Sequence, residues 1–261
     1  MTPVAHHTVQ LADLEVHYLD AGSGPDLILL HGGLATAEMM WGDRIGSLAQ
    51  KYHAIAPDSR GHGKTRNSGH HLGYDQMADD TARLADALGI GSPMLLGYSD
   101  GAQIALEFAI RHPGRARGMV LGGVVSEPHD AYLKGLTEWG FTVPHADIEA
   151  IQRSFGDEFF NETKRVHGYD GEDWHLFLDQ IAKLWVGVPR YADEQLKAIE
   201  TPTLISVGDR DAMAGLEQAL RLFTLLPKAE LAVIPNGDHG VAESELFWVP
   251  VLNFLQRAAE R

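Results

Sequence analysis

Residues 94–102 read Met94-Leu95-Leu96-Gly97-Tyr98-Ser99-Asp100-Gly101-Ala102, and the organisation of the rest of the chain follows from them. A short apolar run leads directly into a Gly-x-Ser-x-Gly segment, after which apolar residues recur at helical spacing: Ile104, Ala105, Phe108 and Ala109. This order predicts a buried strand, a very tight turn with Ser99 at its apex, and then a helix. The two glycines suit such a turn, because a side chain at either position would collide with the neighbouring strand or helix. Ser99 would then stand above the sheet at the positive end of the helix dipole.

Two interpretations of Ser99 are open at this point. It could be a catalytic nucleophile, or it could be a helix N-cap in an ordinary glycine-rich turn. The first interpretation requires a base, an acid and an oxyanion-binding site elsewhere in the chain.

The composition excludes several classes of chemistry and of partner. The chain has 261 residues, of which 44% are apolar and 22% charged, as in an ordinary globular protein with one large domain. Its formal net charge is −15, so we expect no nucleic-acid and no membrane partner, because both need a positive surface. The absence of cysteine excludes disulfides, thiolate catalysis and cysteine-ligated metals. The first ten residues are polar and no long apolar run occurs elsewhere, so we expect a soluble, cytoplasmic protein.

Strand and helix patterns alternate along most of the chain. Residues 9–20 alternate between apolar and polar side chains, as in antiparallel edge strands. Continuous apolar runs typical of strands buried on both faces occur at 27–30, 53–56, 94–98, 119–125, 203–207 and 231–234. Helical patterns separate most of these runs, which predicts a parallel sheet with right-handed crossovers.

The alternation stops between residues 126 and 199, where the pattern is helical and rich in aromatic residues. Breaks at Pro144, Gly156, Gly168 and Pro189 divide this segment into short helices. We therefore predict a core formed by residues 1–125 and 200–261, and a helical lid of residues 126–199 over the carboxyl edge of the sheet. Most aromatic residues of the lid are expected to form its own core, and one or two to line a pocket.

Three kinds of side chain are predicted to meet at this carboxyl edge, in the chain order serine, aspartate, histidine. A serine hydroxyl needs a histidine to take its proton, and a carboxylate to orient and stabilise that imidazole. His239 is the predicted base among 14 histidines, because it follows the last strand in Gly237-Asp238-His239-Gly240. The acid lies in Gly208-Asp209-Arg210-Asp211. Glycines in His31-Gly32-Gly33-Leu34 would let the backbone pass close to a ligand and point its N–H groups inward.

The chain resembles the α/β-hydrolase superfamily over essentially its whole length. The segments that carry the resemblance, in the family's order and spacing, are His31-Gly32-Gly33, Asp58-Ser59-Arg60-Gly61-His62-Gly63, Gly97-Tyr98-Ser99-Asp100-Gly101, Gly208-Asp209-Arg210-Asp211 and Gly237-Asp238-His239-Gly240. The resemblance implies an α/β-hydrolase fold: a mostly parallel eight-stranded sheet with helices on both faces and a helical lid inserted after the sixth strand. It implies that Asp211, rather than Asp209, is the acid. It also implies that the backbone N–H groups of Leu34 and Asp100 form the oxyanion hole. A serine nucleophile disfavours the haloalkane dehalogenase and epoxide hydrolase branches.

Asp100 is the residue that could limit the range of possible substrates. Its carboxylate would repel an oxyanion about 6 Å away by roughly 3 kcal/mol at an effective dielectric constant of 20, so either the side chain turns away or the substrate carries a cation. The Ser99-Asp100-Gly101 segment is similar to that of valacyclovirase-like (biphenyl-hydrolase-like) hydrolases, in which the equivalent acid holds the α-amino group of amino-acid esters. Tyr98, Ala102 and His31 depart from that pattern, which has tryptophan, glycine and proline there. Asp100 could otherwise complement the helix dipole.

The chain is therefore predicted to be a serine hydrolase that acts through an acyl-Ser99 intermediate without a metal or an organic cofactor. Its expected partner is a small carboxylic ester, with an α-amino-acid ester as one candidate, or else a lactone or an activated amide. The candidate substrate contacts are Gly33, Asp100, Trp139 and Trp185. The alternatives are a ligand sensor on the same scaffold with slow or no turnover, a cofactor-free perhydrolase and a carbon–carbon bond hydrolase.

Overall fold

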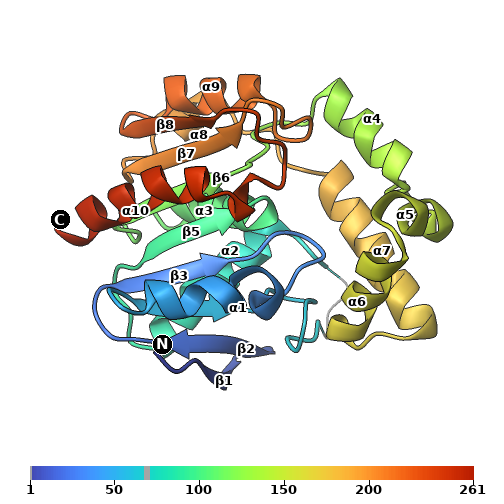
Figure 1. Cartoon of the computed structure of the whole chain (residues 1–261), viewed down its shortest axis with the longest axis horizontal. Helices are drawn as coiled ribbons and strands as arrows, with labels where there is room; N and C mark the ends of the chain where they lie inside the picture. Colours follow the sequence, from blue (N-terminus) through green and yellow to red (C-terminus); the bar gives the residue numbers. More distant parts are fainter. Residues whose placement is uncertain (1, 68–70) are drawn as a thin grey trace.

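The computed structural model describes residues 2–67 and 71–261. Within these residues eight strands form one sheet in the order β1-β2-β4-β3-β5-β6-β7-β8 (Figure 1). The strands are β1 (Ala5–Leu11), β2 (Leu14–Ala21), β3 (Asp26–Leu30), β4 (His53–Pro57), β5 (Met94–Tyr98), β6 (Gly118–Gly122), β7 (Thr203–Gly208) and β8 (Ala229–Ile234). Strand β2 pairs antiparallel with β1 and β4, and the other pairs are parallel. The predicted mostly parallel eight-stranded sheet is confirmed.

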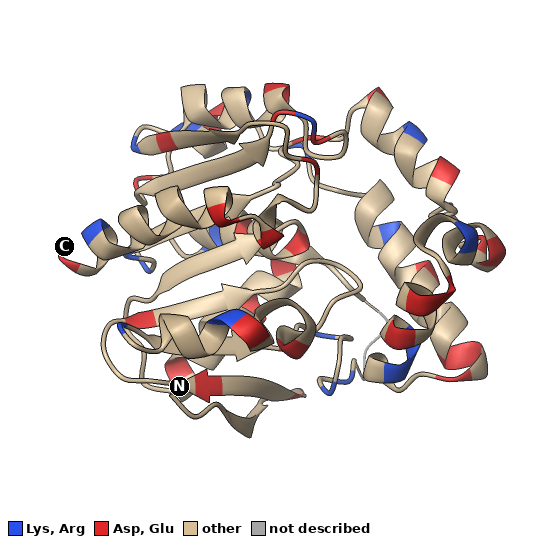
Figure 2. Ribbon diagram, viewed as in Figure 1, with Lys and Arg blue, Asp and Glu red and all other residues tan. Residues whose placement is uncertain are grey.

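Helices cover both faces of the sheet (Figure 1). One face carries α1 (Ala37–Leu48) and α10 (Glu245–Ala259), and the other carries α2 (Tyr74–Ala87), α3 (Asp100–Arg111) and α9 (Leu216–Leu225). Successive side chains of a strand point to opposite faces. In β3, accordingly, Leu27 and Leu29 pack with α1 and α10, while Ile28 and Leu30 pack with α2 and α3. Figure 2 shows the charged residues mainly on helices and loops around this apolar sheet. None of the described helices is long and apolar enough to cross a membrane.

The segment between β6 and β7 holds the inserted helices. These are α4 (Asp130–Trp139), α5 (Ile148–Phe155), α6 (Asp157–His167), α7 (Gly171–Val186) and α8 (Asp193–Lys197). Figure 1 shows α4 to α7 beyond the carboxyl ends of the parallel strands. Gly156 and Gly168 separate α5, α6 and α7 with positive φ angles of 81° and 60°. The predicted insertion of short helices after the sixth strand is confirmed.

The sequence misplaced two strand boundaries by three or more residues. Strand β1 begins at Ala5 rather than Val9, because it is an edge strand whose first residues are polar and exposed. Strand β6 ends at Gly122 rather than Val125, because Gly123 has a φ of 60° and turns the chain out of the sheet. The residues after Gly123 are buried and apolar, so hydrophobicity alone does not mark this strand end.

Asp58, which follows β4, connects three segments at the carboxyl edge of the sheet. Its carboxylate accepts hydrogen bonds from the Ala37 N–H at 2.9 Å and the Lys64 N–H at 3.0 Å, and lies 2.9 Å from His17 Nδ1. Burial by itself would raise the pKa of this carboxyl. The hydrogen bond from His17 and those from the two backbone amides outweigh burial and hold the pKa of Asp58 at about 2, below its ordinary value of 3.8.

The substitution Asp58→Asn should lower the free energy of unfolding by about 2 kcal/mol at pH 7. Because the folded-state pKa is depressed, this stabilisation is complete above pH 3.8 and is lost as the pH falls through about 2. Urea unfolding of both proteins at pH 7 and pH 3 should therefore show a difference that shrinks to about half at pH 3. A difference that is equal at the two pH values would mean that the carboxylate charge is not its source.

Candidate active site

Ser99 lies between β5 and α3 in a strained backbone conformation, with a φ of 52° and a ψ of −117°. A Cβ atom on Gly97 would lie 2.1 Å from the Gly101 carbonyl oxygen. A Cβ atom on Gly101 would lie 2.0 Å from the Leu30 carbonyl oxygen. Both contacts are shorter than any real Cβ contact, so the collisions expected from the sequence are found. The two glycines let strand and helix approach closely enough to hold Ser99 at the apex.

Ser99, His239 and Asp211 form one hydrogen-bonded chain. The Ser99 Oγ lies 3.1 Å from His239 Nε2, and His239 Nδ1 lies 2.9 Å from Asp211 Oδ2. The other oxygen of Asp211 accepts the N–H groups of Met213 and Ala214, both at 2.9 Å. Burial favours a higher pKa for Asp211, but the hydrogen bond and charge of His239 and the two amides outweigh it and hold the pKa below its ordinary value. The carboxylate beside the imidazole is therefore ionised at neutral pH.

The structure brings Asp211 rather than Asp209 to the histidine. Asp209 points to the surface, where its carboxylate lies 3.8 Å from Arg210. Tyr98 contributes a contact that the sequence did not reveal, because its hydroxyl donates to the His239 carbonyl oxygen at 2.7 Å, across 141 residues of chain. This bond fixes the loop that carries the imidazole.

The loop after β3 runs beside Ser99. A Cβ atom on Gly32 would be 3.4 Å from the Cβ of Ser99. Leu34 has a φ of 60°, which costs a non-glycine residue of order 1–3 kcal/mol and is typical of functional sites. The structure records no acceptor among the described residues for the Leu34 N–H, and the Asp100 N–H, at the first position of α3, has no partner inside its own helix. Two backbone donors therefore have no recorded acceptor among the described residues, one on the loop beside Ser99 and one on the residue that follows Ser99.

A cavity with a volume of about 140 Å³, the inner cavity, adjoins Ser99. The four predicted substrate contacts Gly33, Asp100, Trp139 and Trp185 all line it. The inserted segment contributes more aromatic side chains than the one or two expected: Tyr132, Trp139, Phe155, Phe159 and Trp185. Several inserted helices turn a face toward the sheet, which the sequence pattern of each helix alone does not show. The remaining lining residues are Leu34, Tyr74, Ser99, Gln103, Gly123, Val125, Val188, Met213 and His239.

Asp100 is buried in the wall of the inner cavity and held by two neutral donors. The Tyr74 hydroxyl donates to Oδ1 and the Trp185 Nε1–H to Oδ2, both at 2.8 Å. A Cβ atom on Gly33 would lie 2.6 Å from Oδ2, so a larger residue there would displace the carboxylate. Burial raises the pKa of Asp100, and the bonds from Trp185 and Tyr74 and the nearby His239 oppose that rise only in part. No lysine or arginine of the described chain forms an ion pair with it.

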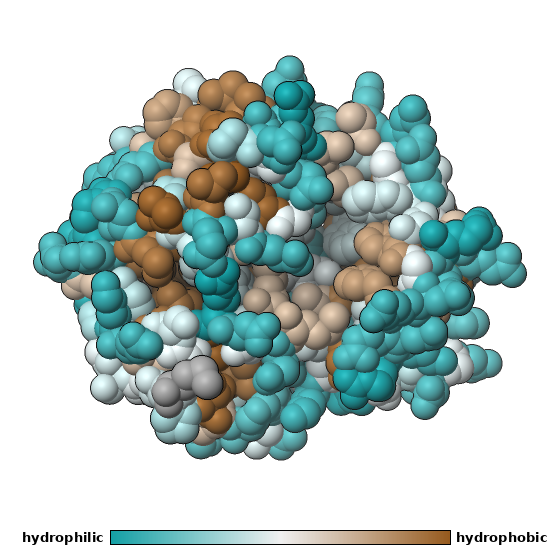
Figure 3. All heavy atoms as spheres, in the orientation of Figure 1, coloured by the Kyte–Doolittle hydropathy of each residue, from teal (hydrophilic) through white to brown (hydrophobic). Residues whose placement is uncertain are grey.

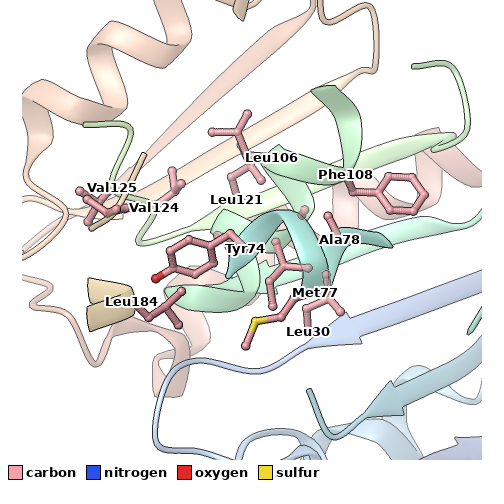
Figure 4. Close-up of a cluster of buried hydrophobic side chains, with 14 of the residues drawn as sticks. Leu30, Tyr74, Met77, Ala78, Leu106, Phe108, Leu121, Val124, Val125 and Leu184 are labelled. Carbon is pink, nitrogen blue, oxygen red and sulfur yellow. The ribbon is translucent and has the colours of Figure 1, made fainter. Parts of the chain in front are cut away.

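Tyr74, which the sequence analysis did not single out, comes from the first turn of α2. Figure 4 shows its ring among buried apolar side chains, with Val124, Val125 and Leu184 close by. The apolar neighbours hold the ring in place, and the Tyr74 hydroxyl reaches the Asp100 carboxylate. The only sequence signal was its position at the start of a predicted amphipathic helix.

A second, more open depression, the outer groove, meets the inner cavity at Ser99. Gly33, Ser99, Phe159 and His239 line both. The rest of the outer groove is formed by the loop after β3, Tyr98, α1, and the loop and helix after β8. Figure 3 shows the surface hollowed between the core and the inserted helices. The serine therefore borders two depressions, of which the inner one is lined mainly by aromatic and apolar side chains and the outer one is somewhat more open. In the described part of the chain, no group of three or more histidine, aspartate or glutamate side chains could hold a metal ion.

Comparison of the sequence and the structure with known proteins identifies a matching family and several similar proteins. Residues 27–247 match the sequence model of the alpha/beta hydrolase family. A 2-hydroxy-6-oxo-2,4-heptadienoate hydrolase of Pseudomonas putida is 31% identical over 245 residues, which cover 87% of each chain. A pyrrolizixenacetamide deacetylase of Xenorhabdus hominickii is 26% identical over 95% of this chain and 97% of its own. The crystal structure of a meta-cleavage product hydrolase of Pseudomonas fluorescens superposes with a TM-score of 0.81 at 26% identity, covering 97% of this chain and 98% of that one.

Proposed function

This chain belongs to the alpha/beta hydrolase family, and on that premise we propose that it is a serine hydrolase that cleaves a small carboxylic ester through an acyl-Ser99 intermediate. The observation that carries the proposal is the hydrogen-bonded chain from Ser99 through His239 to the buried Asp211. A lactone or an activated amide would be cleaved by the same steps. We also assign residues 126–199 as a lid, supported by their aromatic side chains in the wall of the inner cavity.

The proposed reaction begins as Ser99 Oγ attacks the carbonyl carbon while His239 Nε2 takes the hydroxyl proton. The carbonyl oxygen, now negative, accepts hydrogen bonds from the N–H groups of Leu34 and Asp100. His239 then donates its proton to the leaving alkoxide, and the alcohol departs through the outer groove. A water molecule then gives a proton to His239 as its oxygen attacks the acyl carbon. When this second intermediate collapses, His239 returns that proton to Ser99 Oγ, which releases the acid and regenerates the serine hydroxyl. Asp211 stays ionised throughout and stabilises the imidazolium.

The charge of the inner cavity limits the acyl group that it can hold. Its lining among the described residues includes the carboxylate of Asp100 but neither lysine nor arginine. A dienoate, the substrate named for the Pseudomonas putida relative, carries a carboxylate that Asp100 would repel. We therefore propose a neutral or cationic acyl group. The cavity volume of about 140 Å³ is close to that of an engineered cavity that binds benzene, so the acyl group should be small.

An α-amino group is the cation that Asp100 is best placed to receive. Its carboxylate is buried without a positive partner, and the aromatic walls of the cavity favour an ammonium group as well. Wild-type protein should hydrolyse methyl 2-aminobutanoate with a kcat/KM about 10- to 100-fold above that of methyl butanoate. In Asp100→Asn this ratio should collapse, while the backbone N–H of residue 100 is retained.

An ammonium group also activates the ester chemically, so the informative quantity is the change of the ratio between the two proteins. The asparagine side chain of the Asp100→Asn variant can keep both contacts, since its carbonyl oxygen can accept from Trp185 and its amide can donate to the Tyr74 hydroxyl. If the ratio of the two kcat/KM values were the same in both proteins, Asp100 would not bind the substrate. Its role would then be to complement the helix dipole, and the protein would be a general esterase.

Carbon–carbon bond hydrolysis is the second candidate, favoured by two of the similar proteins. Steady-state assays with 2-hydroxy-6-oxohepta-2,4-dienoate and with methyl butanoate distinguish the two. Turnover of the dienoate alone would replace the ester proposal. Multiple turnovers of either substrate would exclude a slow ligand sensor, and acyl transfer to added hydrogen peroxide would indicate a perhydrolase.

A further inference from the structure

Gln103 is a buried polar residue to which the proposed reaction assigns no task. It lies on α3, four residues after Ser99, and lines the inner cavity. Its exposed fraction is 2%. Neither its Nε2 nor its Oε1 has a hydrogen-bond partner among the described residues. Both the donor and the acceptor of this amide are therefore unused at the wall of the cavity.

Three other polar side chains in the same wall already have partners. Tyr74 and Trp185 donate to Asp100, and the Tyr132 hydroxyl donates to the Trp185 carbonyl oxygen at 3.0 Å. A buried amide without a partner destabilises a protein, and most buried polar groups are for that reason satisfied. An unsatisfied amide at a cavity wall is accounted for when a bound molecule supplies the missing bonds.

We propose that Gln103 binds a neutral group with both a donor and an acceptor in the acyl part of the substrate, and that a carboxamide is its match. This inference rests on the proposed function, because it takes Ser99 as the atom that attacks the ester. A carboxamide can pair with the glutamine amide through two complementary hydrogen bonds, whereas a carboxylate could accept from it but would be repelled by Asp100.

The spacing along α3 indicates how far this group should stand from the reacting carbon. Ser99 and Gln103 are about one helical turn apart, which is about 5.4 Å along the axis. A carboxamide roughly three bonds beyond the ester carbonyl can reach across that distance. Methyl 4-amino-4-oxobutanoate has this arrangement, and methyl 4-methylpentanoate is the hydrocarbon of nearly equal shape.

The test compares the kcat/KM values of these two esters. Wild-type protein should favour the carboxamide ester about 10- to 100-fold, because the hydrocarbon leaves the Gln103 amide unpaired. Gln103→Leu should abolish or reverse this preference, and Gln103→Met serves as a second variant if the leucine does not fit. The matched control is Gln218→Leu, since Gln218 is also buried but does not line the cavity and already accepts from Ser126 and Glu127. The control should leave the preference unchanged.

Thermal unfolding supplies a readout that does not depend on hydrolysis. Without ligand, Gln103→Leu should have a Tm no lower than wild type, because it removes an unsatisfied amide, whereas Gln218→Leu should lower the Tm by several degrees. Butanamide should raise the Tm of wild type and of Gln218→Leu, but not that of Gln103→Leu.

The outcomes separate the two proposals. If wild type hydrolyses the hydrocarbon ester, and Gln103→Leu changes neither the preference nor the butanamide shift, the role of Gln103 is refuted and the proposed function stands. If wild type hydrolyses neither ester, these substrates give the proposed function no support, and the butanamide shifts alone decide whether Gln103 binds an amide. A large loss of Tm in ligand-free Gln103→Leu would show that the protein itself satisfies this side chain.

Discussion

Replacing Ser99 with alanine should lower kcat/KM for methyl butanoate by about 10⁵- to 10⁶-fold while the protein stays folded. The loss is this large because the proposed nucleophile is removed, and only binding and the two proposed backbone donors remain to assist water. Alanine can occupy the same backbone conformation, since both residues carry one Cβ at the φ of 52°. The measurement is initial-rate hydrolysis at several ester concentrations, together with thermal unfolding of both proteins.

Ser206→Ala is the matched control for that substitution. Ser206 is fully buried on β7, near the same edge of the sheet, and its hydroxyl has no partner among the described residues. Its removal should leave kcat/KM within a few-fold of wild type. If Ser99→Ala kept activity within tenfold of wild type, Ser99 would not be the nucleophile.

The substitution Asp211→Asn should lower kcat by about 10⁴-fold, with little change in KM. The asparagine oxygen can still accept the N–H groups of Met213 and Ala214, which turns its NH₂ group toward His239 Nδ1. A donor at that position stabilises the tautomer whose Nε2 carries the proton, and that nitrogen cannot take the proton of Ser99.

Asp209→Asn is the matched control for the assignment of Asp211 as the acid that supports His239. Asp209 lies 3.8 Å from Arg210 and does not contact His239, so its substitution should change kcat by no more than a few-fold. The same steady-state assay measures both variants. A larger loss in Asp209→Asn than in Asp211→Asn would show that the acid had been assigned to the wrong residue.

The parts of the fold and site that the sequence predicted are those set by local constraints. Gly97 and Gly101 have no room for a Cβ, so the strand, turn and helix around Ser99 could be recognised from spacing alone. The apolar runs of β7, which is buried, and of β8, which is half-buried at the edge of the sheet, placed Asp211 and His239 at one carboxyl edge. Strand β1 was partly missed because its exposed edge carries polar residues.

The parts that could not be predicted depend on contacts between distant residues. Asp100 receives its hydrogen bonds from Tyr74, 26 residues away, and from Trp185, 85 residues away. Nothing in the pattern of α2 or α7 singles out these donors. Gln103 did carry a weak signal, as a polar residue within the apolar pattern of α3, but its lack of a partner becomes visible only when the surrounding side chains are placed.

Stoichiometric labelling with diethyl 4-nitrophenyl phosphate tests the proposed acyl transfer most directly, because a phosphoryl-serine is stable where an acyl-serine is transient. Wild-type protein should release one equivalent of nitrophenolate, lose esterase activity in parallel, and carry the diethylphosphoryl group on the peptide that contains Ser99. Ser99→Ala should release none. Loss of esterase activity with the label on a different residue, or sustained ester hydrolysis by fully labelled protein, would contradict catalysis through Ser99.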